Sequence, residues 1–144
     1  KEIIDAYFKE FPAVKEYMDG VIAKAQKDEY VETILGRRRY LRDINSRNMN
    51  MRGFAERNAI NAPIQGSAAD LIKVAMIHVH NWMKKEKLKS KMILQVHDEL
   101  VFDAHKDEIE LLKANIPGLM SNAIKMKVPV EVEVGSGMDW LEAH

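Results

Sequence analysis

The chain has 144 residues, of which 47% are hydrophobic and 31% are charged, and its formal net charge is zero. This length and composition are typical of one soluble globular domain. The absence of cysteine excludes disulfides and thiolate metal sites. No apolar run approaches the roughly 18 residues of a membrane span, and no signal-peptide pattern opens the chain, so we expect a cytoplasmic protein without a membrane partner.

Charge is distributed unevenly along the chain. Between residues 37 and 57 there are seven arginines and only two acidic residues, whereas ten acidic residues and four lysines follow from residue 98 to the end. A basic stretch beside an acidic one fits a protein that binds both phosphate groups and cations. A solvated arginine-rich loop would give the same pattern.

The N-terminal part combines helical and hairpin signals. Apolar residues recur at three- and four-residue steps over residues 11–25, which predicts an amphipathic helix. Alternating runs at residues 30–34 and 38–41 predict a hairpin that turns near Gly36. Residues 43–50 are polar and without periodicity, which predicts a surface loop.

Two helices are predicted next, separated by a proline. The first covers residues 51–61 and is perturbed near Pro63, because proline lacks the amide hydrogen that a helix needs. The second begins at Ser67 as N-cap, with Asp70 three residues later in a capping-box arrangement.

The C-terminal half reads as a hairpin, a helix and a strand. Residues 92–96 and 100–102 are apolar and are separated only by His97–Glu99, which predicts a tight hairpin with polar residues at its tip. A helix is expected over residues 106–126 and a strand over residues 128–134. The order of elements predicts an α+β fold with an antiparallel sheet backed by helices.

The hairpin tip carries the clearest chemical signal. Asp98 and Glu99 place two adjacent carboxylates between apolar strands, and carboxylate oxygens are the ligands that Mg²⁺ prefers. Phosphoryl transfer uses such ions, often two that lie about 3.5–4 Å apart. Two other interpretations stay open: a polar turn with a backbone role, and a zinc hydrolase site built from His97, Asp98 and His105.

A second signal lies on the predicted helix. Arg57, Asn61 and Gln65 are four residues apart and therefore share one helical face. Arginine suits phosphate and sugar, and the two amides match the hydrogen-bond acceptors of a DNA minor groove. A polar stripe on a surface helix is the alternative interpretation.

Together these segments resemble DNA polymerase family A. Residues 95–102 resemble motif C of that family, and residues 57–70 resemble the helix that precedes it. Residues 30–38 and 132–140 are also similar to family segments, so the resemblance covers essentially the whole chain in order. It implies a C-terminal polymerase-domain fragment, with residues 1–50 as a fingers remnant and residues 51–144 as a palm portion.

The resemblance also implies an activity. The parent protein would be a DNA-directed DNA polymerase of replication and repair, in which the primer 3′-hydroxyl attacks the α-phosphate of a deoxynucleoside triphosphate and releases pyrophosphate. Its partners would be template–primer DNA, the dNTP and Mg²⁺. The implied residues are Asp98 and Glu99 as catalytic metal ligands, His97 near the primer terminus, and Arg57, Asn61 and Gln65 on the template–primer.

The sequence departs from the family pattern in two ways. Arg42 stands where the family usually has proline, and the family's motif A aspartate strand and nucleotide-binding fingers helix (motif B) are not in the sequence, which begins at Lys1. We therefore expect an excised fragment that is inactive alone, or alternatively a non-catalytic duplex DNA-binding module. A palm sheet without its motif A strand is also expected to self-associate or to have a locally disordered edge.

Overall fold

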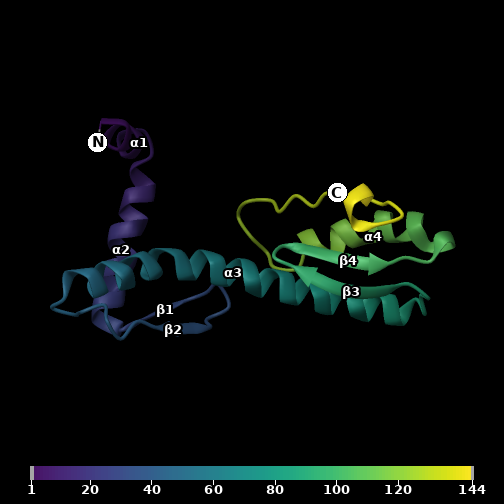
Figure 1. Ribbon diagram of the computed structural model, residues 1–144, viewed down its shortest axis with the longest axis horizontal. Coiled ribbons are helices and arrows are strands. Elements are labelled where there is room, and N and C mark those ends of the chain that lie inside the picture. The colour runs from purple at the N-terminus through teal and green to yellow at the C-terminus, as the bar shows by residue number, and fades with distance from the viewer. Residues whose placement is uncertain (1, 144) are drawn as a thin grey trace. The chain divides into compact units, whose positions relative to one another are not determined.

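The computed structural model describes residues 2–143 and divides the chain into two compact units, Lys1–Ser67 and Ala68–His144 (Figure 1). The elements are α1 (Glu2–Glu10), α2 (Pro12–Asp28), β1 (Tyr30–Glu32), β2 (Arg38–Tyr40), α3 (Met49–Lys85), β3 (Lys91–Val96), β4 (Glu99–Asp103), the 3₁₀ helix η1 (Lys106–Glu108), α4 (Ile109–Ser121) and α5 (Trp140–Ala143). No described helix is both long enough and apolar enough to cross a membrane. The expected division at residue 50 into fingers and palm stays a prediction.

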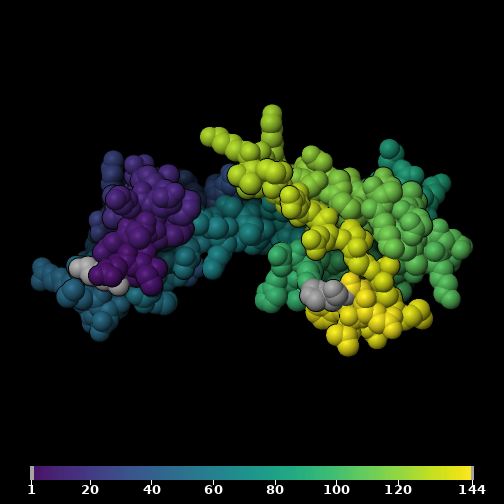
Figure 2. Space-filling model, turned by 90° about the horizontal axis from the view of Figure 1, so that it is seen from above, coloured from purple at the N-terminus to yellow at the C-terminus, as the bar shows by residue number. Residues whose placement is uncertain are grey.

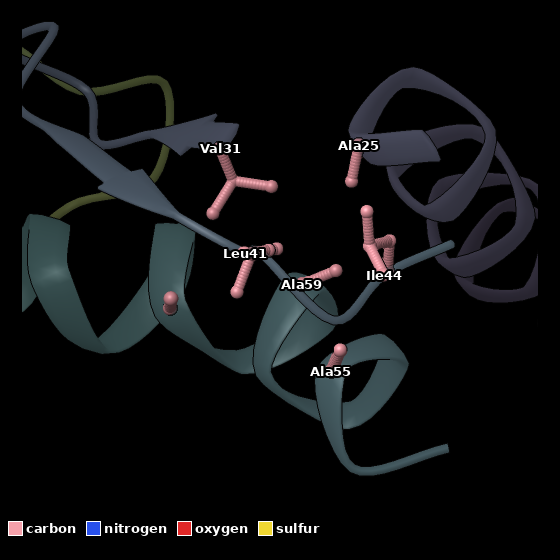
Figure 3. Packing of buried hydrophobic residues seen from close by; sticks show 7 residues of the cluster. Ala25, Val31, Leu41, Ile44, Ala55 and Ala59 are labelled. Atoms are coloured by element: carbon pink, nitrogen blue, oxygen red, sulfur yellow. The ribbon is translucent and has the colours of Figure 1, made fainter. Parts of the chain in front are cut away.

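The first unit contains the predicted hairpin. β1 and β2 pair antiparallel, with Tyr30 opposite Tyr40, and Gly36 lies in the connecting turn with φ +79°. That left-handed conformation favours glycine, so the predicted turn near Gly36 is confirmed. The hairpin packs with α2 and the first half of α3 around small apolar side chains (Figure 3); the buried cluster is Ala25, Val31, Leu41, Ile44, Ala55, Ala59 and Ala62.

Helix α3 corrects two predictions. It runs without interruption through Pro63, so the predicted break there and the N-cap role of Ser67 are both wrong. Asn48 caps the helix instead, because its Oδ1 accepts hydrogen bonds from the amides of Asn50 (3.0 Å) and Met51 (3.4 Å). Ala59 and Ala62, which precede Pro63 on the helix, are buried in the core of the first unit.

The second unit contains a two-stranded antiparallel sheet. β3 and β4 pair with Val96 opposite Glu99, and the register is irregular between Met92 and Leu94. Side chains from the C-terminal half of α3 and from α4 form the buried cluster below it, which comprises Ile72, Ala75, Val79, Met83, Leu112, Ile116 and Met120. The predicted α+β class, with an antiparallel sheet backed by helices, is confirmed.

The C-terminal stretch differs from its prediction. The helix expected to reach residue 126 ends at Ser121, and the strand predicted over residues 128–134 is absent. Alternation favours a strand only where another strand can pair with it, and no described segment pairs with this one. The stretch instead lies against its own unit (Figure 2), where Val132 packs on the buried cluster.

Candidate functional site

The hairpin tip is as tight as the sequence predicts. β3 ends at Val96 and β4 begins at Glu99, which leaves His97 and Asp98 as the two turn residues. His97 has φ 52°, a left-handed conformation that is uncommon for residues other than glycine but in which histidine, asparagine and aspartate are enriched. The Gln95 side-chain amide donates a hydrogen bond to the His97 carbonyl (2.6 Å) and holds this backbone in place. The turn therefore presents Asp98 in an exposed position on a fixed scaffold.

The tip offers part of a cation site. Asp98 is exposed and Glu99 is half-buried, and their carboxylate oxygens are suitable donors for Mg²⁺. Among residues 2–143, however, no three His, Asp or Glu side chains come close enough to hold a metal together. This finding contradicts the zinc-site interpretation. His105 instead is the N-cap of η1, where its Nδ1 accepts a hydrogen bond from the Asp107 amide (3.4 Å).

The base of the hairpin is fixed by one carboxylate. Glu108 accepts hydrogen bonds from the amides of Lys89 (2.9 Å) and Ser90 (2.8 Å) and from the Ser90 hydroxyl (2.5 Å). The buried Ser90 hydroxyl also accepts a hydrogen bond from the His105 amide (2.9 Å). These bonds favour the charged carboxylate, the Lys89 amide contributing most, and lower the pKa of Glu108 to about 2. Glu108 thereby ties the start of β3 to the segment that follows β4.

The second candidate set lies on one continuous helix. Arg57, Asn61 and Gln65 all belong to α3, and all three side chains are exposed. Ala59 and Ala62, which lie among them in the sequence, are buried in the core of the first unit; Figure 3 shows Ala59 in this core. The helix therefore separates a packed face from a solvent-facing polar one, as the four-residue spacing predicts.

Side chains from other elements hold the middle of this helix. The Tyr17 hydroxyl on α2 donates a hydrogen bond to the Ile60 carbonyl (3.1 Å), and partial burial raises the pKa of Tyr17. Arg39 on β2 donates through Nη2 to Asn58 Oδ1 (3.2 Å). Both contacts lie next to a candidate DNA-binding residue, since Ile60 precedes Asn61 and Asn58 follows Arg57.

The β1–β2 turn contacts the helix just beyond Pro63. Arg37 Nη2 donates to the Gly66 carbonyl (3.1 Å), and the Ile34 amide donates to Ser67 Oγ (2.8 Å). Ser67 Oγ in turn donates to the Pro63 carbonyl (2.5 Å). A Cβ atom at Gly66 would lie only 2.6 Å from Thr33 Cγ2, so glycine is required for this close approach.

The structure brings the six predicted site residues together as two sets. His97, Asp98 and Glu99 share the hairpin of the second unit, whereas Arg57, Asn61 and Gln65 share the helix face of the first. The positioning contacts made by residues 17, 34, 37 and 108 were not foreseen from the sequence. One signal was available for the contact of Ile34 with Ser67. Ser67 follows Pro63 by four residues, a spacing at which its hydroxyl can reach the proline carbonyl in a helix.

Comparison with known proteins decides the family. The model of DNA polymerase family A matches residues 1–142. The chain belongs to DNA polymerase family A. Relatives of this family include the DNA polymerase I of Geobacillus stearothermophilus, which is 50% identical over 142 residues (99% of this chain), and that of Bacillus subtilis strain 168, which is 48% identical over 140 residues (97% of this chain). The chain spans 16% of the length of either relative.

A solved structure of the same family gives the same fold. The structure described as the POL domain of Pol1 from M. smegmatis, in complex with DNA primer-template and dNTP, matches with a TM-score of 0.95 and 48% sequence identity. The match covers 97% of this chain and 25% of that one. The resemblance seen in the motif C hairpin and the helix before it is thus confirmed, while the roles of the individual residues stay predictions.

Proposed function

We propose that this chain forms the motif C hairpin and the template–primer helix of a DNA-directed DNA polymerase that acts in replication and repair. The observation that carries the proposal is the exposed Asp98 at a two-residue turn, inside a chain whose family match runs from residue 1 to 142. The substrates would be template–primer DNA and dNTPs. A role on DNA is consistent with a cytoplasmic location.

In this proposal Asp98 and Glu99 bind divalent cations, with Mg²⁺ as the expected ion. When bound, the metal would offset negative charge on the attacking and leaving oxygens of the phosphoryl transfer. The chain supplies part of the donor set, because two adjacent carboxylates cannot enclose two ions. His97, whose backbone shapes the turn, is assigned to the primer terminus.

The exposed face of α3 is assigned to the template–primer duplex. Asn61 and Gln65 can donate to the minor-groove acceptors that every base pair presents, so their contacts would check duplex geometry without reading sequence. Arg57 is assigned to the sugar–phosphate backbone. All three residues of this face belong to the unit Lys1–Ser67. Binding of duplex DNA without catalysis is therefore the alternative function.

A chimera tests the proposal. The matched segment of the Geobacillus stearothermophilus polymerase is replaced by residues 1–142 of this chain, and templated primer extension is measured with Mg²⁺ and dNTPs. We expect extension by the chimera and a loss of at least about 100-fold in Asp98→Asn, because a catalytic metal contributes several kcal/mol. Asp103→Asn is the matched control, since Asp103 is an exposed acid at the other end of the same hairpin.

Two outcomes would contradict the proposal, and a third would favour its alternative. Equal rates for the Asp98 and Asp103 variants would remove Asp98 from the metal site. Templated incorporation by the 144-residue chain alone would show that it needs no further carboxylates. Duplex binding by a chimera that cannot extend primers would favour the non-catalytic alternative.

A further inference from the structure

One face of the β1–β2 hairpin carries a pair of tyrosines. Tyr30 and Tyr40 lie opposite each other on the two strands, whereas the next residue, Val31, points to the other face and is buried in the core. The ring centroids of the two tyrosines lie 5.9 Å apart in an edge-to-face arrangement, and the Arg38 guanidinium lies over the Tyr30 ring at 4.4 Å. These contacts orient the Tyr40 ring, although Tyr40 is 67% exposed.

A cavity of about 300 Å³ lies beside Tyr40. It is lined by Glu29, Tyr40 and Arg42, and all three residues are exposed to solvent. Among residues 2–143, neither the Glu29 carboxylate nor the Arg42 guanidinium takes part in an ion pair. The cavity therefore offers an acidic group, a basic group and an aromatic ring to one bound molecule.

Glu29 reaches this cavity from an unusual backbone conformation. It is the C-cap of α2, with φ 59° and ψ 17°, and its amide donates a hydrogen bond to the Ala25 carbonyl (2.8 Å). Glycine is the usual residue in this left-handed conformation, because a Cβ atom crowds the backbone there. The Glu29 carbonyl accepts a hydrogen bond from the Leu41 amide (2.8 Å), which fixes Glu29 opposite the residue between Tyr40 and Arg42. A strained residue with a charged side chain beside a cavity is a candidate for a binding role.

The three side chains match the groups of one nucleobase. Small-molecule sites usually measure about 300–1,000 Å³, so this cavity suits a base better than a whole nucleotide. Guanine presents two adjacent donors, N1–H and the N2 amino group, to a carboxylate such as Glu29, and no other DNA base has such a pair on one edge. Its acceptors O6 and N7 suit Arg42, and its ring can stack on Tyr40. Pairing with cytosine would occupy both donors, so the base must be unpaired.

We propose that Glu29, Tyr40 and Arg42 form a binding site for an unpaired guanine base, either in a single-stranded nucleic acid or in a free guanine nucleotide. The choice of a nucleobase rests on the proposed function, because a polymerase segment meets unpaired template bases. The site itself is a separate one, since neither Asp98 nor any residue of α3 lines this cavity. It predicts a preference for guanine that a uniformly basic surface would not show.

The test measures binding of the 144-residue chain to two fluorescein-labelled oligothymidylates by anisotropy. One carries a single central deoxyguanosine, and the other carries deoxyinosine, whose base lacks only the N2 amino group. We expect the guanine oligonucleotide to bind about 10-fold more tightly, because inosine loses a hydrogen bond to a charged carboxylate. Glu29→Gln should remove most of this preference. Arg42→Gln should weaken binding of both oligonucleotides, because inosine retains O6 and N7.

Matched controls separate the site from total charge and from folding. Glu16→Gln should keep the guanine preference, because Glu16 is an exposed acid of the same helix α2 that does not line the cavity. Arg47→Gln serves in the same way for Arg42, since Arg47 is exposed in the same basic stretch. Glu29→Gly relieves the left-handed strain, so the urea midpoint should stay the same or rise while the guanine preference disappears.

Competition with free mononucleotides assigns the source of the base. GMP should displace the labelled guanine oligonucleotide better than IMP does. A GMP affinity equal to that of the oligonucleotide would identify a free nucleotide as the ligand, and a weaker one would identify the single strand. Equal binding of the guanine and inosine oligonucleotides, equal effects of Glu16→Gln and Glu29→Gln, or no binding at all would overturn the site. None of these results affects the primer-extension test, which judges the proposed function separately.

Discussion

Removing the Ser67 hydroxyl should loosen the attachment of the β1–β2 turn to α3. This hydroxyl accepts from the Ile34 amide (2.8 Å) and donates to the Pro63 carbonyl (2.5 Å). Each hydrogen bond contributes about 1 kcal/mol net, and alanine recovers about 0.5 kcal/mol through its higher helix propensity. Ser67→Ala is therefore expected to lower the free energy of unfolding by about 1.5 kcal/mol.

Urea denaturation followed by circular dichroism measures this change. For urea slopes of about 1–3 kcal/mol per molar, the transition midpoint should fall by about 0.5–1.5 M. Hydrogen exchange gives a local measurement, because the Ile34 amide should lose its protection. Ser121→Ala is the matched control, since its hydroxyl makes two long contacts, donating to the Gly118 carbonyl and accepting from Asn122 Nδ2 (both 3.4 Å). Equal midpoint shifts, or unchanged exchange at Ile34, would refute the reasoning.

Two further predictions concern the hairpin of the second unit. The pKa of Glu108 is lowered from 4.5 to about 2, so its stabilising contribution is complete above about pH 4.5 and is lost as the pH falls toward 2. Glu108→Gln should flatten the decline of the urea midpoint over that range, whereas Glu110→Gln, whose carboxylate makes an exposed ion pair with Lys113 (3.6 Å), should not. His97→Gly relieves a left-handed backbone conformation but adds freedom to the unfolded chain, so the free energy of unfolding should rise by about 0–1 kcal/mol. A fall of more than about 1 kcal/mol in urea denaturation would show that the imidazole stabilises the turn.

Local sequence signals were sufficient to predict both hairpins. A glycine between two short alternating runs fixed the turn at Gly36, where φ is +79°. Val96 and Glu99 pair across the two strands, so only two residues between them can reverse the chain. Because apolar strands flank these two residues, the sequence alone predicts that Asp98 lies in the turn. In both places the turn and the strands depend on residues adjacent in the sequence, and the prediction was correct.

The errors arose where distant segments decide the outcome. Pro63 favours a break on local grounds, yet α3 continues through it, where alanines pack into the core and the Ile34 amide of the hairpin binds Ser67. Residues 128–134 alternate correctly but have no pairing strand among the described residues. Pairing and docking contacts depend on neighbours in space, so propensity and periodicity alone could not predict them.

The same reasoning explains how the candidate site residues Asn61 and Gln65 of α3 can be exposed and yet well positioned. An exposed amide gains no order from burial, so its placement must come from the backbone that carries it. Tyr17 binds the carbonyl of Ile60, next to Asn61, and Arg37 binds the carbonyl of Gly66, next to Gln65. Each candidate amide is thus flanked by a backbone group that a different element holds from the packed side. The hairpin and α2 accordingly support the helix through its backbone carbonyls, while the side chains of Asn61 and Gln65 stay exposed.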